Sequence, residues 1–328
     1  MPRISSRRGA GTLPAVTQPM PPRDTTSAAE RWRNVLSPPG TILADGAMGT
    51  MLFSAGLQFG DPPEVWTLTQ SEVIRRVHRG YLDAGARILL TNTFGGNRRR
   101  LALTGHERRV AEFNRTAAIL LRAEVDAAGG TALVAGDIGP TGEIMAPLGT
   151  LDPGEAVDAF AEQAAALIAG GVDVLWIETM SDLAEIHAAI RGIRQVRGDL
   201  PIIATMTFDT RGHTMMGVSP EKAVAALAEW GADAIGANCG NGPEEVVRVI
   251  ERMRAVAPDV TLVAKSNVGM PQLVDGRAVY LTGPDVMATR SVEMHDAGAR
   301  IIGACCGSTP EHLQAMARAL GVRSASAA

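Results

Sequence analysis

Residues 299–306 read ARIIGACC, a nearly continuous apolar run that begins just after Gly298 and ends in two cysteines. A strand that is covered on both faces needs such a run, because neither of its faces meets water. The corner Gly298-Ala299-Arg300 recurs with small changes as Gly85-Ala86-Arg87 and Gly231-Ala232-Asp233. A glycine at this point relieves the left-handed turn at the end of a helix. The stretch therefore predicts a helix, a corner and a buried strand, repeated along the chain.

Seven further apolar runs precede this one, at residues 41–45, 86–92, 132–138, 172–179, 201–208, 232–238 and 260–267. Segments between them, such as 155–169 and 244–256, place apolar residues three and four positions apart, as amphipathic helices do. Eight strand–helix units in roughly 280 residues predict an α/β fold, a single (β/α)8 TIM barrel, here over residues 31–322. A doubly wound open sheet is the alternative, but it usually has a glycine-rich phosphate turn after its first strand. The sequence GAMGT at residues 46–50 lacks that spacing.

Composition and charge narrow the class of protein. The chain has 328 residues with a net charge of -4, 46% hydrophobic and 20% charged residues, which excludes global disorder. It has no basic stripe interleaved with aromatic residues and no apolar stretch long enough to span a bilayer, so nucleic-acid and membrane partners are not expected. Residues 1–30 show no apolar period and are expected to be a disordered tail, and residues 323–328 a flexible C-terminus. The odd count of three cysteines argues against disulfides and predicts a cytoplasmic protein.

Polar residues close nearly every apolar run, at the end where a TIM barrel carries its active site. All three cysteines of the chain belong to this set, which a random scatter of cysteines would rarely produce. In chain order the set is Asp45, Asn92, Asp137, Glu178, Phe208-Asp209, Asn238-Cys239, Ser266-Asn267 and Cys305-Cys306.

The cysteines favour a metal site. A lone cysteine is more often a small buried apolar residue than a ligand, and Cys239 alone fits that interpretation. The adjacent pair Cys305-Cys306 can meet one ion if the strand ends there, and Gly307 allows such a break. Three thiolates form a zinc shell with an open fourth position, whereas a redox pair normally has a two-residue spacer. We expect one zinc ion per chain on these three cysteines.

A zinc ion with three thiolates carries a net charge of about -1 and is a poor Lewis acid. It is better suited to binding an incoming thiol as the thiolate, a form that few free thiols adopt at neutral pH. That sulfur can then attack a methyl group. The other polar residues at the strand ends would orient the acceptor, with Glu178 or Asp45 receiving an ammonium group. The residues alone therefore predict zinc-activated alkyl transfer to a thiol.

Six blocks follow one another over about residues 40–320, namely DGAMGTM (45–51), TNTFG (91–95), GDIGPT (136–141), IETM (177–180), GANCG (236–240) and GACCG (303–307). Together they resemble the homocysteine S-methyltransferase family. The pattern is similar to the homocysteine-binding barrel of cobalamin-dependent methionine synthase and to betaine–homocysteine methyltransferases. The resemblance implies a TIM-barrel enzyme that methylates homocysteine to methionine, with zinc on Cys239, Cys305 and Cys306.

The resemblance also implies roles for single residues. Glu178 and the Asp45-Gly46 turn would hold the amino-acid end of homocysteine. Asn267 is the candidate for the fourth zinc ligand in the resting state, and a turn-stabilising role fits this residue equally well. Three further residues are expected to line the pocket, although asparagines at strand ends also commonly satisfy turns. They are Asn92, Thr93 and Asn238.

Two classes of methyl donor fit the sequence. A quaternary ammonium donor is usually held by aromatic rings, but Gly95-Gly96 stands where animal betaine enzymes carry a donor-contacting aromatic residue. The block TFGGN at residues 93–97 is nearer to bacterial methionine synthases, in which a corrinoid or folate module brings the methyl group. The donor is therefore a small molecule of the betaine or S-methylmethionine type, or a corrinoid or folate carrier protein that acts in trans.

Two other functions fit parts of the pattern. Lys265 lies late in the seventh predicted strand and could form a Schiff base in a barrel aldolase, with a pKa lowered by burial. Glu178 and the cysteines would have no role in that chemistry. A non-catalytic protein that binds zinc or a corrinoid partner is the second alternative, and it predicts bound zinc without any homocysteine-dependent product.

Overall fold

The protein is described by a computed structural model over residues 26–274 and 277–322. Its centre is an eight-stranded sheet in the order β1-β10-β7-β6-β5-β4-β3-β2, with all neighbours parallel. Each strand overlaps one of the eight predicted runs. The strands are β1 (Ile42–Leu43), β2 (Ile88–Leu90), β3 (Leu133–Ile138), β4 (Val174–Met180), β5 (Ile202–Met206), β6 (Ala234–Cys239), β7 (Leu262–Ser266) and β10 (Ala299–Ala304).

The sheet closes on itself at the seam between β1 and β2. Ala44 forms a parallel bridge with Ile88. On one side of this bridge the Arg87 N–H donates to the Leu43 carbonyl at 2.7 Å, and on the other the Asp45 N–H donates to the Ile88 carbonyl at 3.0 Å. The predicted TIM barrel is therefore confirmed, because a doubly wound sheet would leave these two strands as free edges.

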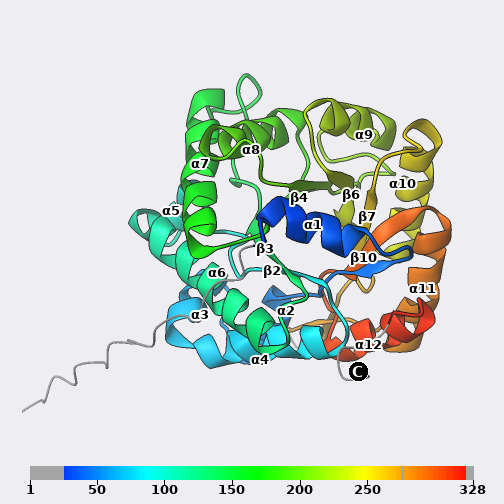
Figure 1. Ribbon diagram of the computed structural model, residues 1–328. Coiled ribbons are helices and arrows are strands. Elements are labelled where there is room, and N and C mark those ends of the chain that lie inside the picture. Colours follow the sequence, from blue (N-terminus) through cyan, green and yellow to red (C-terminus); the bar gives the residue numbers. More distant parts are fainter. Residues whose placement is uncertain (1–25, 275–276, 323–328) are drawn as a thin grey trace, which may run out of the picture.

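Helices surround the barrel (Figure 1). Six of them, α3, α7 and α9 to α12, have proline in the first turn, where the missing N–H breaks no helical hydrogen bond. No helix among the described residues is both long and apolar enough to cross a membrane. The helices are α1 (Ala28–Leu36), α2 (Gly49–Ser54), α3 (Pro63–Thr69), α4 (Ser71–Asp83), α5 (Arg98–Ala102), the 3-10 helix η1 (Glu107–Arg109), α6 (Val110–Ala127), α7 (Pro153–Gly170), α8 (Leu183–Val196), α9 (Pro220–Glu229), α10 (Pro243–Val256), α11 (Pro284–Asp296) and α12 (Pro310–Ala319).

The first helix, α1, lies across the end of the barrel at which the strands begin (Figure 1). Its Trp32 and Val35 are buried in one cluster with side chains from the barrel strands, which include Val174 and Trp176. The predicted tail of residues 1–30 overlaps this helix at residues 28–30. Its first 25 residues, and the predicted flexible C-terminus at 323–328, lie outside the described residues. With one end covered, the loops that follow the strands surround the other end.

A short antiparallel hairpin interrupts the connection from β7 to α11. It consists of β8 (Gln272–Val274) and β9 (Arg277–Val279). The apolar runs did not predict this hairpin, because its strands QLV and RAV each begin with a polar residue and form no continuous apolar run. The dipeptide Asp275-Gly276 in the sequence is typical of hairpin turns and was the available signal.

Candidate active site

The three cysteines meet at the C-terminal ends of β6 and β10. Cys239 is the last residue of β6, whereas β10 ends at Ala304, so that Cys305 and Cys306 lie just beyond the strand. The three Sγ atoms lie within 4.8 Å of one another, and Cys239 Sγ is 2.9 Å from Cys305 Sγ. The strand thus ends at the pair, as a shared metal site would require.

Backbone and amide hydrogen bonds hold the pair in place. The Cys305 N–H donates to the Ser266 carbonyl at 2.7 Å, and the Cys306 N–H donates to Asn267 Oδ1 at 3.0 Å. Asn267 Nδ2 in turn donates to the Gly240 carbonyl at 2.7 Å. One amide therefore ties the end of β6 to the end of β10. This contact is the turn-stabilising role considered for Asn267, and its role as a zinc ligand stays a prediction.

Gly307 and Tyr280 shape the chain just after the cysteines. Gly307 has a φ of +83°, and a Cβ at this position would lie 2.3 Å from the Tyr280 ring and 2.5 Å from Val268. Only glycine therefore fits under the ring. Burial and the neighbouring cysteines raise the pKa of Tyr280 to about 12, so the phenol stays neutral. The sequence analysis did not single out this ring, because it reaches the cysteines from the segment that follows the β8–β9 hairpin.

The thiol cluster stabilises one thiolate. Hydrogen bonds from Cys239 and Cys305 lower the pKa of the Cys306 thiol to about 3. Hydrogen bonds with Cys305 and Cys306 raise the pKa of the Cys239 thiol. Three soft sulfur donors, largely shielded from water, match the ligand type and number that zinc takes when one coordination position stays open for substrate. The residues present therefore fit a zinc ion.

Charged groups are buried inside the barrel close to the cysteines. Lys265 Nζ lies 3.2 Å from Asp45 Oδ1, and the Leu90 N–H donates to Asp45 Oδ2 at 2.8 Å. Burial raises the pKa of Asp45 and raises that of Glu178 to about 8. Burial opposes a charge on Lys265, but Asp45, Glu178 and further acidic groups outweigh it and raise the Lys265 pKa. A Schiff-base lysine needs a neutral amine, so this environment counts against the aldolase alternative.

The Asp45-Gly46 turn is held rigidly. The Tyr81 hydroxyl donates to the Ala47 carbonyl at 2.7 Å, and the Ala47 N–H donates to Ser308 Oγ at 2.9 Å. A Cβ on Gly46 would lie 2.6 Å from Ser308 Oγ, so a side chain cannot be accommodated without displacing these groups. The turn after β1 is therefore packed directly against the loop that carries the cysteine pair.

Asn92 and Thr93 hold neighbouring loops together. Asn92 Nδ2 donates to the Pro63 carbonyl at 2.7 Å and to Thr67 Oγ1 at 3.1 Å, which anchors α3. Thr93 Oγ1 donates to the Asp137 carbonyl at 2.8 Å. Both polar groups are therefore engaged within the protein, and their contact with a substrate stays a prediction.

The Gly95-Gly96 pair leaves no room for a side chain. A Cβ on Gly96 would lie 2.6 Å from Asn114 Oδ1, and a Cβ on Gly95 would lie 3.0 Å from Glu64 Oε1. That same glutamate oxygen accepts the Gly95 N–H at 2.7 Å. Glu64 is buried on α3 and was not recognised in the sequence, because its partner lies in a different loop. A side chain at Gly95 or Gly96 would therefore require the Glu64 or Asn114 side chain to shift.

A family model for homocysteine S-methyltransferase matches residues 42–320. The chain belongs to the homocysteine S-methyltransferase family. The resemblance carried by the six sequence blocks is therefore confirmed.

Relatives of this chain include much longer proteins. Methionine synthase from Mycobacterium tuberculosis (strain ATCC 25618 / H37Rv) is 30% identical over 293 residues, which is 85% of this chain and 24% of that protein. Methionine synthase from Mycobacterium leprae (strain TN) gives the same values. The chain thus spans about a quarter of the length of the curated relatives it matches. Among solved structures, the metallated form of the homocysteine methyltransferase MmuM from Escherichia coli matches with a TM-score of 0.73 at 25% identity, over 87% of this chain and 98% of that one.

The structure brings together most of the residues selected from the sequence. The three cysteines lie next to buried Glu178 and Asp45, whose charges interact with that of Cys305. Asn238 bridges Glu178 and Thr179. Lys265 was considered only as a nucleophile, although a lysine at the end of an apolar strand predicts a buried acidic partner.

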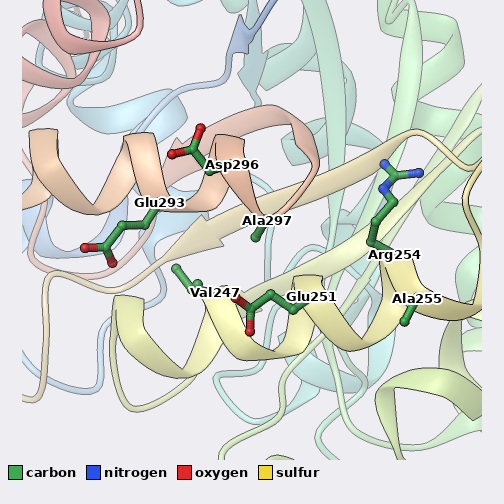
Figure 2. Close-up of a pocket in the computed structure, with 7 residues that line it drawn as sticks. All are labelled: Val247, Glu251, Arg254, Ala255, Glu293, Asp296 and Ala297. Carbon is green, nitrogen blue, oxygen red and sulfur yellow. The ribbon is translucent and has the colours of Figure 1, made fainter.

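A separate groove of about 600 Å³ lies on the outside of the methyltransferase barrel, between α10 and α11 (Figure 2). Three of its lining residues are acidic. Arg254, its basic residue, donates to the Gly298 carbonyl at 2.8 Å and to the Ala257 carbonyl at 3.2 Å, so it stabilises helix ends. The seven lining residues lie outside the six family blocks, and we assign no function to the groove. They are Val247, Glu251, Arg254, Ala255, Glu293, Asp296 and Ala297.

Proposed function

We propose that the protein transfers a methyl group to the sulfur of homocysteine to form methionine, with zinc held by Cys239, Cys305 and Cys306. The observation that carries this proposal is the convergence of three thiols within 4.8 Å at the mouth of a homocysteine S-methyltransferase barrel. A zinc ion bound there would lower the pKa of the homocysteine thiol, so that its sulfur is nucleophilic at neutral pH.

Buried acidic groups would receive the amino-acid end of homocysteine. Glu178 and Asp45 are 7% and 3% exposed, and both lie close enough to Cys305 for their charges to interact. An ammonium group placed between them would favour their ionised forms, which burial alone disfavours. The rigid turn at Gly46 keeps Asp45 in place, and Lys265 balances part of the negative charge.

The methyl donor would enter from the open mouth of the barrel, because α1 covers the opposite end. Two classes of donor stay in the proposal. The Tyr280 ring beside the cysteines offers a face for a small sulfonium or ammonium donor. The similarity to the methionine synthases instead favours a methyl-carrying corrinoid or folate protein that acts in trans.

The test combines metal analysis with a methyl-transfer assay. Homocysteine is supplied with S-methylmethionine, betaine, methylcobalamin or methyltetrahydrofolate, each in turn, and methionine is measured. We expect about one zinc per chain and methionine from at least one donor. C239S should lose most of its zinc and its activity. E178A should keep zinc and raise the KM for homocysteine about tenfold or more, since a charged hydrogen bond is lost.

The zinc analysis and the methyl-transfer assay each test a different part of the proposal. Full zinc in C239S would overturn the metal-site assignment. Zinc without product from any donor would favour the non-catalytic binding protein over the methyltransferase.

A further inference from the structure

Asn238 precedes Cys239 on β6, is 1% exposed, and has a fully engaged side-chain amide. Its Oδ1 accepts from the Thr179 N–H and from Thr205 Oγ1, both at 2.8 Å. Its Nδ2 donates to Thr179 Oγ1 at 2.7 Å and to Glu178 Oε2 at 3.4 Å. An amide side chain has two acceptor and two donor positions, so no position is left for a substrate.

Two residues beside this amide have a positive φ, a backbone conformation that residues other than glycine rarely adopt. Thr179 has a φ of 61° and Cys239 a φ of 58°. For a β-branched residue such as threonine this is a marked outlier, which persists only where the surroundings enforce it. The pairing register between β4 and β5 also shifts between Ile177 and Met180. Such a bulge changes the direction of the side chains at the end of β4, where Glu178 lies.

The amide connects these two irregular points. It binds the backbone N–H and the hydroxyl of Thr179, and it is part of the residue that precedes Cys239. Thr179 Oγ1 also lies 3.8 Å from Cys239 Sγ. The end of the site that carries Glu178 and the end that carries the thiols are therefore joined through a single buried side chain.

We propose that Asn238 is a positioning residue that sets the distance between Glu178 and Cys239, and thereby selects homocysteine over the shorter cysteine. The inference rests on the proposed function, in which Glu178 binds the ammonium group and Cys239 holds the metal that binds the sulfur. Homocysteine has one methylene more than cysteine between these two groups. If the distance between Glu178 and Cys239 is fixed, only an amino acid of the matching length can contact both ends of the site. If that distance can vary, both homocysteine and cysteine can bind.

The experiment uses the zinc-loaded full chain as N238A and N238D. The matched control is N241A, which changes an exposed asparagine in the loop that follows β6, whose Nδ2 donates to the Asp209 carbonyl at 2.8 Å. Two quantities are measured, namely the ratio of kcat/KM for homocysteine to that for cysteine, and the zinc affinity in competition with a chelator. The second readout does not depend on activity.

For N238A we expect the homocysteine preference to fall about tenfold or more, and the zinc affinity to fall about tenfold. N238D keeps an oxygen for the Thr179 N–H and loses the donor to Glu178, so it should lose homocysteine preference while zinc affinity stays within about threefold of wild type. N241A should match wild type in both.

A folded N238A with wild-type preference and zinc affinity would overturn the inference. If N238A does not fold, the test rests on N238D. A folded N238D with the homocysteine preference of wild type would then overturn the inference. A wild-type protein that forms no methionine with any donor contradicts the proposed function instead, so the two failures are distinct.

Discussion

Lys265 is one of two lysines in the chain and lies inside the barrel with 3% of its surface exposed. Its Nζ lies 3.2 Å from Asp45 Oδ1, and it also lies over the Trp176 ring, 5.9 Å from the ring centroid. Charged side chains this deeply buried are nearly always paired, because an isolated charge there is strongly unfavourable. Lys265 is therefore the cation that allows several acidic groups and thiols to share one small space.

Replacing Lys265 with methionine keeps the length of the side chain and removes its charge. We expect K265M to lower the free energy of unfolding by about 3 kcal/mol, since removing one partner of a buried pair leaves Asp45 without its cation. Urea unfolding at pH 7 measures the effect. K222M is the matched control, because Lys222 is exposed on α9 and its loss should change stability by less than about 0.5 kcal/mol. Equal stability of the two variants would contradict the pairing.

The sequence identified the polar residues at the mouth of the barrel but not what each one contacts. Asn92 was expected in the pocket, yet its amide anchors α3 through Pro63 and Thr67, more than twenty residues away in the chain. The convergence of the three cysteines could be predicted, because the residue type is rare and all three close apolar runs. Asparagine can satisfy a turn, a neighbouring loop or a ligand equally well, so its residue type alone does not decide among them.

Among the elements, α4 carries a histidine that makes stability depend on pH. His78 is fully buried against the region of Glu124 on α6, and neither ring nitrogen has a hydrogen-bond partner within the described part of the chain. Burial lowers the pKa of His78 from 6.5 to about 4. His78 therefore becomes protonated near pH 6.5 in the unfolded chain, but only near pH 4 in the folded chain. Acid favours unfolding between these values, and the stability present above pH 6.5 is lost as the pH falls.

We expect this histidine to contribute about 3 kcal/mol to the loss of stability between pH 7 and pH 4, at about 1.4 kcal/mol for each unit of pKa difference. H78L places an apolar side chain of similar size in the same apolar surroundings and removes the titrating group. The free energy of unfolding of H78L should therefore fall less than that of wild type on acidification. Urea unfolding of both proteins at pH 7 and pH 4.5 measures this difference. Parallel pH profiles would show that His78 does not titrate in this range.

The prediction of elements was strongest where the signal is local. The run ARIIGACC predicts a strand that stops at the cysteines, and β10 ends at Ala304 with Gly307 in a left-handed turn soon after. At β4 the local signal was misleading, because a threonine in IETM reads as an ordinary strand residue. Its left-handed backbone depends on the Asn238 amide, which lies 59 residues further along the chain. The periodicity of apolar residues cannot predict such backbone conformations, since they result from tertiary contacts.

At the scale of the whole molecule, the barrel separates the residues that stabilise its closed end from those of the candidate site. The cysteines, Glu178 and Asp45 lie at the mouth, where loops from different strands meet. The opposite end is covered by α1, whose Trp32 is buried in one cluster with side chains from the barrel strands (Figure 1). In TIM barrels the second end contributes stability and the first carries chemistry. A change at α1 should therefore alter unfolding without altering the site.

W32A tests this separation. Trp32 is 6% exposed, and truncating a buried tryptophan leaves a cavity, so we expect the free energy of unfolding to fall by about 3 kcal/mol. In buffer at 25 °C the variant should remain folded, with the zinc content and the KM for homocysteine of wild type. F59A is the counterpart at the mouth, where Phe59 is 99% exposed in the segment between β1 and β2, and it should change stability by less than about 0.5 kcal/mol. A folded W32A protein that has lost zinc or homocysteine affinity would show that the two ends of the barrel are coupled, and that α1 belongs to the active-site architecture.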